Sequence, residues 1–454
     1  MYSKIYQWVL FPLYESLIMG RKTLQYLRLL QESQWLSEER IRDLQWRELK
    51  RLLKHAYRNV PYYRDIFRSL GVTPDDIRTP EDFREIPIID KQVIRENYRS
   101  LIAENYMGRT LTKSTGGTTG IPLQLEFTRD SYEWRRAVMM RHYGWGGYEE
   151  GKKVAYLWSV PVGRYSLFSK LKDDLYHKIL RQKYFNVFDL TPENMERYYH
   201  RMREFKPEHI VAYALQMYYF ARYIDENNLE PFPLKSIILG AEAVTKYQKD
   251  FISFVFNCPV FETYGCREFM LIASECEEHR GMHISAENLY VEVVKDGRPA
   301  EPGEIGEVVI TDLHNYGMPF IRYKNGDLAV LSKEKCPCGR GLPLIERVEG
   351  RLLDVIRTPD GKILTGVFFP HLMNEFKEVD RFQVIQESID SLVVKIIPNP
   401  RYPNVPIDLI KKEIKKVIGT KMNLEIQLVD DIPLSPSGKF RVTISKITDG
   451  NFTL

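Results

Sequence analysis

The sequence has few cysteines, no long apolar run and no strong excess of either charge. Five cysteines in 454 residues are too few, and odd in number, for an extracellular disulfide framework, so we expect a reducing compartment, the cytoplasm. Lysine and arginine total 65 against 61 aspartates and glutamates, a net charge of +4, and no basic run is interleaved with aromatic residues. Nucleic acid is therefore not an expected partner.

The N-terminal stretch "MYSKIYQWVLFPLYESLIMG" is apolar and aromatic, but Lys4, Pro12 and Glu15 interrupt it and no small-residue cleavage site follows. It is therefore predicted neither to span a membrane nor to be a signal peptide. Two alternatives remain. The stretch could make peripheral contact with a membrane surface, or it could form a helix packed on the body of the protein, the commoner outcome for such a pattern.

Periodicity divides the rest of the chain into regions. Residues 21–70 have helical periodicity. From about residue 150, short apolar runs ("KVAYLWSV", "HIVAYAL", "SIILGAE", "CPVFETYG") alternate with helix-like segments, which predicts parallel strands buried on both faces. The runs "LYVEVVKDG", "GEIGEVVITDL" and "DLAVLS" then alternate at period two, which favours an antiparallel, barrel-like subdomain.

The last hundred residues are predicted to form a separate, small α+β domain. A hairpin is expected around residues 359–361, amphipathic helices over "HLMNEFKEV" and "IDLIKKEIKKVIG", and strands over "RFQVIQ", "SLVVKII" and "LEIQLV". The fold class is therefore α/β, with a large N-terminal domain that carries the barrel-like subdomain and a small C-terminal domain.

The stretch "STGGTTGIPLQLEFT", residues 114–128, begins with four hydroxyl side chains and three glycines in seven residues. Glycines let successive backbone N–H groups converge on an anion, and hydroxyls add donors, so phosphate binding is the first interpretation. A flexible loop is the alternative. The stretch is not a mononucleotide P-loop, because Ile121 and Pro122 follow Gly120 where that motif needs lysine and a hydroxyl.

Further motifs follow in order: "GAEAV" (240–244), "ETYGCREF" (262–269), "IRYKNGDLAVL" (321–331), "VEGRLLDVI" (348–356) and "LSPSGKFR" (434–441). The succession resembles the adenylate-forming superfamily, and "ECEEHRGMHI" with "CPCGRGLPLIERVEGR" resembles the phenylacetate–CoA ligase family within it. The stretch "WLSEERIRDLQWRELKRLLKHAYRNVPYYRD" is similar to the branch associated with capsule and O-antigen gene clusters. The resemblance covers nearly the whole chain.

The resemblance implies a two-domain, AMP-forming ligase. Its helical N-terminal part would span residues 1–90, its large adenylation domain 91–350, and its small mobile domain 351–454. ATP and a carboxylic acid would give an acyl-adenylate with release of pyrophosphate, and the acyl group would pass to coenzyme A or another acceptor. Adenylation needs donors on the phosphates, Mg²⁺, and a cation near the developing charge.

The resemblance also assigns roles to residues. Lys439 is implied to be catalytic, Glu268 to associate with Mg²⁺, Tyr264 to lie against adenine, and Asp327 to accept the ribose hydroxyls. The implied nucleotide-binding set further comprises Ser114, Thr115, Gly116, Gly117, Thr118, Thr119, Gly120, Gly240, Ala241, Glu242, Gly265 and Arg351.

Glu268, Asp327 and Lys439 each also have a simpler, non-functional interpretation. Glu268 could be a surface glutamate after a turn, Asp327 a turn aspartate, and Lys439 an exposed lysine beside a glycine turn.

The sequence departs from the superfamily pattern at two places. The phosphate loop lacks the lysine that members of the superfamily often carry near its end, so phosphate neutralisation could depend on magnesium. Leu353 occupies the usual hinge position, with Asp354 one residue later, which puts the domain rotation in question.

The cysteines predict a structural zinc site. Cys336 and Cys338 are close enough in the chain to bind one metal ion through two thiolates, and Cys276 with His283 would complete a tetrahedral Cys₃His set. His279 is a rival ligand, ranked lower because His283 matches the family pattern; free thiols are the alternative to a metal. The other cysteines, Cys258 and Cys266, are expected in the core.

Two aromatic residues are candidates for the pocket that binds the acid. Trp158 and Tyr213 end buried-looking strands, where ligands bind in open α/β sheets, although core aromatics would look the same. Two other functions stay open: an adenylyltransferase that leaves AMP on its substrate, and a non-catalytic nucleotide-binding protein of polysaccharide assembly.

Overall fold

The computed structural model describes residues 2–114, 123–158, 176–186, 191–242, 244–351, 356–360, 363–364, 368–373, 375–433 and 441–447. Within these ranges the N-terminal elements are helical: α1 (Tyr2–Ile5), the π-helical segments η1 (Tyr6–Leu10) and η2 (Leu13–Ile18), α2 (Thr23–Ser33), α3 (Glu38–Asn59), α4 (Pro61–Leu70), α5 (Pro80–Arg84), α6 (Lys91–Glu96) and the short 3₁₀ helix η3 (Glu104–Tyr106). The helical region predicted over 21–70 is confirmed by α2, α3 and α4.

The ends of these helices follow from their sequence. The Ser37 hydroxyl accepts a hydrogen bond from the Arg40 N–H and so caps α3. Pro61 opens α4, where its missing N–H costs nothing, and Gly71 ends that helix with φ +67°, a left-handed conformation that favours glycine. No helix of the described ranges is long and apolar enough to cross a bilayer.

The four predicted apolar runs form parallel strands of one sheet. They are β3 (Val154–Trp158), β5 (His209–Tyr213), β6 (Ser236–Gly240) and β7 (Val260–Cys266), and β4 (Gln182–Asn186) extends the sheet in the order β7-β6-β5-β3-β4.

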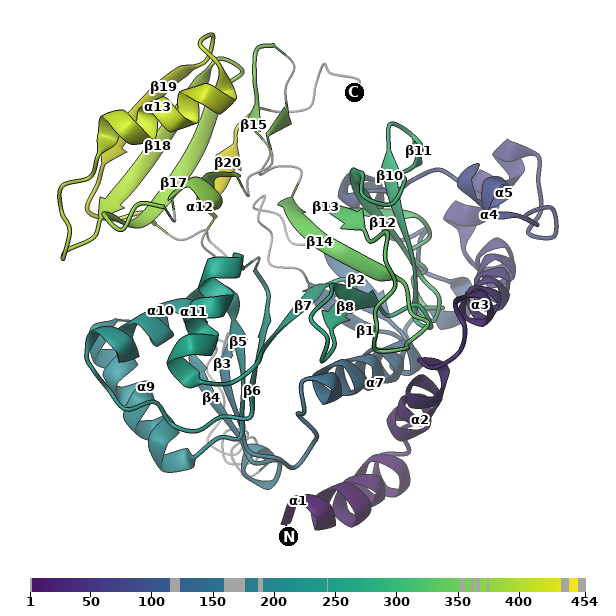
Figure 1. The fold of residues 1–454 in the computed structure, drawn as a ribbon. Helices are drawn as coiled ribbons and strands as arrows, with labels where there is room; N and C mark the ends of the chain where they lie inside the picture. The colour runs from purple at the N-terminus through teal and green to yellow at the C-terminus, as the bar shows by residue number, and fades with distance from the viewer. Residues whose placement is uncertain are drawn as a thin grey trace.

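Both faces of this sheet are covered, as predicted. Ala155 and Ile237 pack against α9 (Pro192–Phe205), α10 (Ala214–Glu226) and α11 (Lys246–Phe256). Val154 and Ile238 pack against α2 and α7 (Arg129–Trp145) on the other face (Figure 1). Neighbouring strand residues point to opposite faces, so a strand buried on both sides is apolar throughout.

Strand β7 also begins the antiparallel half of the molecule. It pairs with β8 (Met270–Glu275), and the order continues β9-β14-β13-β12-β10-β11. These strands are β9 (Met282–Ile284), β10 (Leu289–Lys295), β11 (Arg298–Pro299), β12 (Ile305–Asp312), β13 (Tyr323–Leu331) and β14 (Leu344–Arg351). The predicted antiparallel strands are thus confirmed, and they are continuous with the parallel sheet through β7.

A separate hairpin flanks the predicted phosphate loop. Strand β1 (Leu111–Ser114) pairs antiparallel with β2 (Gln124–Phe127), and Ser114 lies opposite Gln124. The backbone therefore enters and leaves this loop on neighbouring strands. Residues 115–122, which carry the rest of the predicted phosphate-binding set, lie outside the described residues.

The C-terminal residues form a sheet with its own core, drawn at the upper left of Figure 1. Its strands are β17 (Val379–Ser388), β18 (Ser391–Pro398), β19 (Asn423–Leu428) and β20 (Thr443–Ser445), in the order β19-β18-β17-β20. They pack with α12 (Phe368–Met373) and α13 (Ile407–Ile418), after the predicted hairpin β15 (Ile356–Arg357) and β16 (Ile363–Leu364). The domain boundaries at residues 90 and 351 stay predictions.

The predicted helix over "HLMNEFKEV" is wrong in its second half. Helix α12 ends at Met373, and the Phe376 N–H then donates to the Met373 carbonyl in a turn that leads into β17. Phe376 is buried in the core of the small domain, and tertiary packing has overridden the local pattern.

Candidate active site

A cavity of about 2660 Å³ lies between the two domains and meets the carboxyl ends of the parallel strands. Such ends are where open α/β sheets bind ligands. Eight predicted site residues line the cavity: Trp158, Tyr213, Ala241, Glu242, Tyr264, Gly265, Glu268 and Asp327. The small domain contributes Asp380, Arg381 and Arg441, and Arg441 lies two residues after Lys439, which itself falls outside the described residues, as do Leu353 and Asp354.

Tyr264 and Asp327 meet in one hydrogen-bonded cluster. The Tyr264 hydroxyl on β7 donates to Asp327 Oδ2 on β13 at 2.8 Å. The Asn325 amide donates to both, at 2.8 Å to the tyrosine oxygen and 2.7 Å to Asp327 Oδ2. Burial and the nearby Asp327 carboxylate raise the pKa of Tyr264 well above its usual value, so the phenol stays a donor. The backbone of Arg351 on β14 lies opposite Asp327.

The plainer interpretation of Asp327 as a turn aspartate does not account for this contact. A turn aspartate bonds its own backbone within a few residues, whereas Asp327 accepts from a side chain 63 positions away. The cluster holds the carboxylate at the cavity wall. Gly326, with φ +88°, supplies the left-handed bend that precedes it.

Glu268 lies in the turn between β7 and β8 and is only 4% exposed, so it is not a surface glutamate. Its Oε1 accepts from the Tyr323 hydroxyl at 3.1 Å and is 3.8 Å from Lys91 Nζ. The guanidinium of Arg135 donates to the Glu268 carbonyl oxygen and also pairs with Asp312. The carboxylate is thus held from two sides at the cavity wall.

The turn that carries Glu268 depends on Gly265. A Cβ there would lie 1.9 Å from the Met270 carbonyl oxygen, too close for any other residue without movement of the backbone. The close approach of β7 and β8 therefore accounts for this glycine within the "ETYG" motif.

Sequence reasoning missed Asn325, Tyr323 and Lys91. Asn325 and Tyr323 stand within the quoted stretch "IRYKNGDLAVL", and their spacing from Asp327 on one strand was the available signal. Lys91 gave no such signal, because a parallel bridge between Ile89 and Tyr323 brings it to the site from far along the chain. Lys91 and Lys113 both line the cavity, so lysines exist near it although the loop itself has none.

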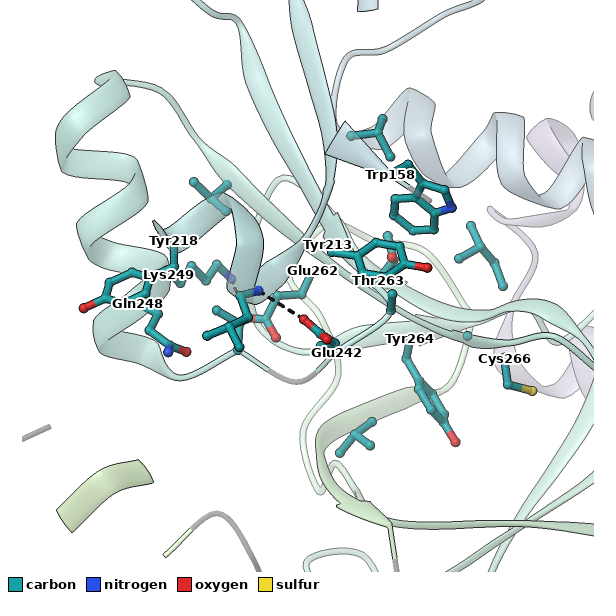
Figure 2. A pocket seen from close by; sticks show the side chains of 18 of the residues that line it. Trp158, Tyr213, Tyr218, Glu242, Gln248, Lys249, Glu262, Thr263, Tyr264 and Cys266 are labelled. Carbon is teal, nitrogen blue, oxygen red and sulfur yellow. Dashed lines mark hydrogen bonds and ion pairs between the residues drawn. The ribbon is translucent and has the colours of Figure 1, made fainter. Parts of the chain in front are cut away.

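Trp158 and Tyr213 form an aromatic part of the cavity wall (Figure 2). Their rings meet edge to face with centroids 4.5 Å apart. Gly240, next to them on β6, lies opposite Tyr213, and a Cβ there would be 2.7 Å from the Thr263 hydroxyl oxygen and 3.6 Å from the Trp158 ring. A small residue at this position is required by packing.

The two residues after Gly240 turn the chain away from the strand. Ala241 has φ +68°, which is uncommon without glycine. Glu242 Oε2 accepts from the Leu215 N–H, in the first turn of α10, at 3.4 Å. Its carboxylate therefore lies near a helix N-terminus, where negative charge is stabilised.

Lys249 forms a second charged group at the cavity wall (Figure 2). Its Nζ lies 2.6 Å from Glu275 Oε1 and 3.0 Å from Glu262 Oε1. Burial raises the pKa of Glu262, while Lys249 opposes that shift. The three side chains bind α11 to β7 and β8.

The four predicted zinc ligands lie together, at the end of β8, on β9 and in the loop before β14. One ligand atom from each of Cys276, His283, Cys336 and Cys338 lies within 4.8 Å of the others. The Cys276 and Cys336 sulfurs are 3.6 Å apart, and Cys338 Sγ is 3.3 Å from His283 Nε2. None of the four lines the cavity.

The surroundings of the cluster suit a metal site closed to solvent. Cys276 and His283 are fully buried, and the second ring nitrogen of His283 lies 3.3 Å from the Leu342 carbonyl oxygen, which leaves Nε2 unprotonated as an acceptor. Burial lowers the pKa of His283 to about 4, so the ring is neutral near pH 7. Burial raises the pKa of Cys338, but backbone and side-chain contacts with Arg340 lower it overall.

The remaining sulfur and imidazole groups lie elsewhere. The rival ligand His279 contacts Glu275 Oε2 at 3.3 Å and is not part of the cluster. Cys258 is in the core, as predicted. Cys266 packs against the core but is half-buried and lines the cavity, so its prediction as a simple core residue is only partly right.

Known proteins resemble the chain along most of its length. The family model described as CapK C-terminal domain matches residues 356–446. Protein CapK of Staphylococcus aureus is 27% identical over 422 residues, 89% of each chain. A phenylacetate-coenzyme A ligase of Escherichia coli is 28% identical over 382 residues, 79% of this chain and 83% of the relative.

Solved structures show the same fold. A 2-hydroxyisobutyryl-CoA ligase in the postadenylation state, in complex with 2-HIB-AMP, matches with a TM-score of 0.73 at 20% identity and 90% coverage of both chains. The same ligase in the thioesterification state gives 0.61. The chain is a homologue of CapK and of the phenylacetate-coenzyme A ligases, and it has the two-domain α/β fold of adenylate-forming CoA ligases.

Proposed function

We propose that this protein activates a carboxylic acid with ATP to form an acyl-adenylate, releases pyrophosphate, and then transfers the acyl group to a thiol, coenzyme A. The observation that carries the proposal is the Tyr264, Asn325 and Asp327 cluster beside Glu268, in a cavity between the two domains. Relatives that are coenzyme A ligases support it.

Each side chain has chemistry that suits a role. Asp327 presents a fixed carboxylate that can accept both ribose hydroxyls, and the Tyr264 ring offers an apolar face to adenine. Glu268 supplies the hard oxygen ligand that Mg²⁺ prefers, and Mg²⁺ would neutralise phosphate charge. Lys91, 3.8 Å from Glu268, can supply a second cation on that side.

Lys439 completes the proposed site from the small domain. A lysine is a mobile point charge, suited to the developing charge between the acid and the α-phosphate. Residues 114–120 would hold the outer phosphates through backbone N–H groups and hydroxyls, and the β1–β2 pairing fixes the ends of that loop. Trp158 and Tyr213 would bound the acid pocket.

We further propose a structural zinc in the Cys276, His283, Cys336 and Cys338 cluster. Three thiolates and one imidazole nitrogen are a tetrahedral donor set typical of zinc, and four protein ligands leave no position for water. The cluster would join β8 and β9 to the loop before β14, which pairs with β9 at His283.

The cellular setting is a separate part of the proposal. ATP and coenzyme A as reactants favour the cytoplasm, and the sequence resemblance to the capsule-associated branch favours polysaccharide biosynthesis as the process served.

A screen of pyrophosphate exchange tests the function. The protein, ATP, Mg²⁺ and labelled pyrophosphate are incubated with aryl, acyl and amino acids, and exchange should rise with the correct acid. Coenzyme A should then be consumed as AMP is released. AMP left on the product would instead indicate an adenylyltransferase, and nucleotide binding without exchange for any acid would indicate a non-catalytic protein.

A further inference from the structure

The outward side of the N-terminal segment carries large apolar side chains in contact with solvent. Trp8 is 80% exposed, Leu17 76% and Ile18 67%. The N-terminal apolar face, as we define it, consists of Ile5, Trp8, Val9, Leu10, Leu13, Leu17 and Ile18, each at least 40% exposed. Contiguous exposed apolar residues on a helical segment mark a site of interaction.

The opposite side of the segment is fixed to the protein. Tyr6 and Phe11 are buried and pack with Leu180. Glu15 is fully buried, and its Oε1 accepts from Arg21 at 2.9 Å and from Arg136 at 2.7 Å. The segment is thus held by one side, which turns the apolar face outward at the end of the molecule marked N in Figure 1.

The charges exposed along this face are positive. Within residues 2–22 the only acidic side chain is the buried Glu15, whereas Lys4 and Lys22 are exposed at the two ends of the segment. Lys178 adds another exposed cation. It lies close to the segment, because the carbonyl of its neighbour Ile179 accepts from the Tyr2 hydroxyl.

The nearest acidic groups at the edges of the face have partners. Glu149 accepts from the Gln7 amide at 3.0 Å. Asp130 accepts from the Tyr26 hydroxyl at 2.5 Å and is 3.5 Å from Lys22 Nζ. The face therefore combines apolar side chains, one tryptophan and flanking lysines.

We propose that the N-terminal apolar face docks this protein on an anionic lipid bilayer, where it lies in the headgroup region without crossing. Tryptophan and tyrosine favour that interface, apolar side chains insert beneath it, and lysines are attracted to anionic lipids. A second copy of the chain fits less well, because a twofold contact would bring the lysines of both copies together, and the exposed acids at the edges of the face, Asp130 and Glu149, already pair with Lys22 and Lys152 of their own chain.

Docking would place the membrane beside the active-site cavity. Ile18 belongs to the N-terminal apolar face and also lines the cavity, as does the adjacent Met19. The inference does not depend on the reaction performed there, and it is tested without an activity assay.

Vesicle sedimentation tests the proposal on the full chain. Vesicles of phosphatidylcholine with one quarter phosphatidylglycerol should pellet the wild-type protein, and pure phosphatidylcholine should pellet much less. The triple variant Trp8→Ser, Leu17→Ser, Ile18→Ser should bind the anionic vesicles at least about tenfold more weakly, because it removes apolar area that inserts into the bilayer. All three residues are exposed, so the fold should be retained.

A matched variant controls for the loss of surface apolar groups in general. Phe254, Leu409 and Leu428 are 76%, 48% and 48% exposed and lie far along the chain. The variant Phe254→Ser, Leu409→Ser, Leu428→Ser should bind vesicles like wild type. Equal binding by wild type and the N-terminal variant would overturn the proposal, as would a wild-type dimer in light scattering that the N-terminal variant alone converts to monomer.

Discussion

Two largely buried polar clusters lie in the antiparallel half of the molecule, but only one of them faces the cavity. The Cys276, His283, Cys336 and Cys338 cluster directs its ligand atoms at one another and contributes nothing to the cavity wall. In the other cluster, Tyr264, Glu268 and Asp327 all line the cavity. Both are polar groups that burial would penalise if they were unpaired.

The two clusters are expected to have different roles, one in the stability of the fold and the other in the reaction. A closed set of four ligands satisfies itself with a metal and stabilises the strands that carry it. A cluster with partners on one side and a cavity on the other is held in place and still open to a ligand. Losing the first should reduce the amount of folded protein, and losing the second should reduce the reaction per folded molecule.

The largest effect is expected at Lys439, the proposed catalytic lysine of the small domain. Lys439→Ala should lower acid-dependent pyrophosphate exchange by about 10²-fold or more, as when one charge-stabilising donor is removed. Transfer from a pre-formed acyl-adenylate should stay near the wild-type rate, because the lysine acts on the α-phosphate only during adenylation. Both assays are run on the same preparation.

Lys446 provides the matched control in the same domain. It is 55% exposed and pairs with Glu387, so Lys446→Ala should leave both assays unchanged. Equal losses of exchange and transfer in Lys439→Ala would mean that the lysine supports structure instead. Slow transfer already in wild type would point to the displaced hinge at Leu353 and Asp354.

Loss of a ligand from the sulfur cluster should act on stability. Purified wild-type protein should contain about one zinc per chain by elemental analysis, as one tetrahedral site requires. Cys338→Ser should lose most of the metal and lower the melting temperature, while exchange per folded molecule changes little. Cys258→Ser removes a cysteine outside the cluster and should keep the zinc. A wild-type protein without zinc would contradict the proposal.

A smaller effect is expected at the cavity cluster itself. Asp327→Asn keeps an oxygen that can accept from Tyr264 but removes the charge that would bind the ribose hydroxyls. The KM for ATP should rise about tenfold, the scale of a hydrogen bond to a charged group. Glu307→Gln removes a carboxylate on the neighbouring strand that pairs with Lys324 away from the cavity, and it should leave KM unchanged. An unchanged KM in Asp327→Asn would remove the aspartate from the site.

The sequence predicted the strands that are buried on both faces, because their apolar runs need no long-range information. "SIILGAE" and "HIVAYAL" became β6 and β5 as expected. The motif order also anticipated that Tyr264 and Asp327 belong to one site, and the structure brings them within 2.8 Å. The strands follow from residue types alone, whereas the shared site was implied by the family resemblance.

What the sequence did not predict depends on tertiary contacts. Lys91 reaches Glu268 only because Ile89 bridges to Tyr323, a contact with no local pattern. The end of α12 at Met373 follows from the burial of Phe376, although the sequence favours a longer helix. The outward face of the N-terminal segment likewise became visible only once Tyr6 and Phe11 were seen to pack inward.

An effect on stability alone is expected at a buried group that belongs to neither cluster. The Ser236 hydroxyl donates to the Gly146 carbonyl, so it accepts from His209 Nδ1 at 2.8 Å. Burial and the nearby Lys152 lower the pKa of His209 to about 4. The pKa of an unperturbed histidine is about 6.5, so between pH 4 and about pH 6.5 the unfolded state binds more protons than the folded state. The contribution of His209 to the free energy of unfolding is therefore complete above about pH 6.5 and is lost as the pH falls toward 4.

Denaturant unfolding at several pH values measures this slope. His209→Gln should flatten the loss of unfolding free energy between pH 6.5 and 4, by at most about 3 kcal/mol. Because His209 lies outside the cavity and outside the sulfur cluster, His209→Gln should change neither pyrophosphate exchange nor the zinc content. An identical slope in the variant would mean that other groups set the acid sensitivity.

Acid-dependent pyrophosphate exchange, measured per folded molecule in wild type, Asp327→Asn and Cys338→Ser, tests the central claim most directly. The account predicts exchange in wild type with one class of carboxylic acid. At limiting ATP, Asp327→Asn should be about tenfold slower and Cys338→Ser should match wild type after correction for unfolded protein. Absence of exchange with every acid in folded wild type, or equal losses in the two variants, would contradict it.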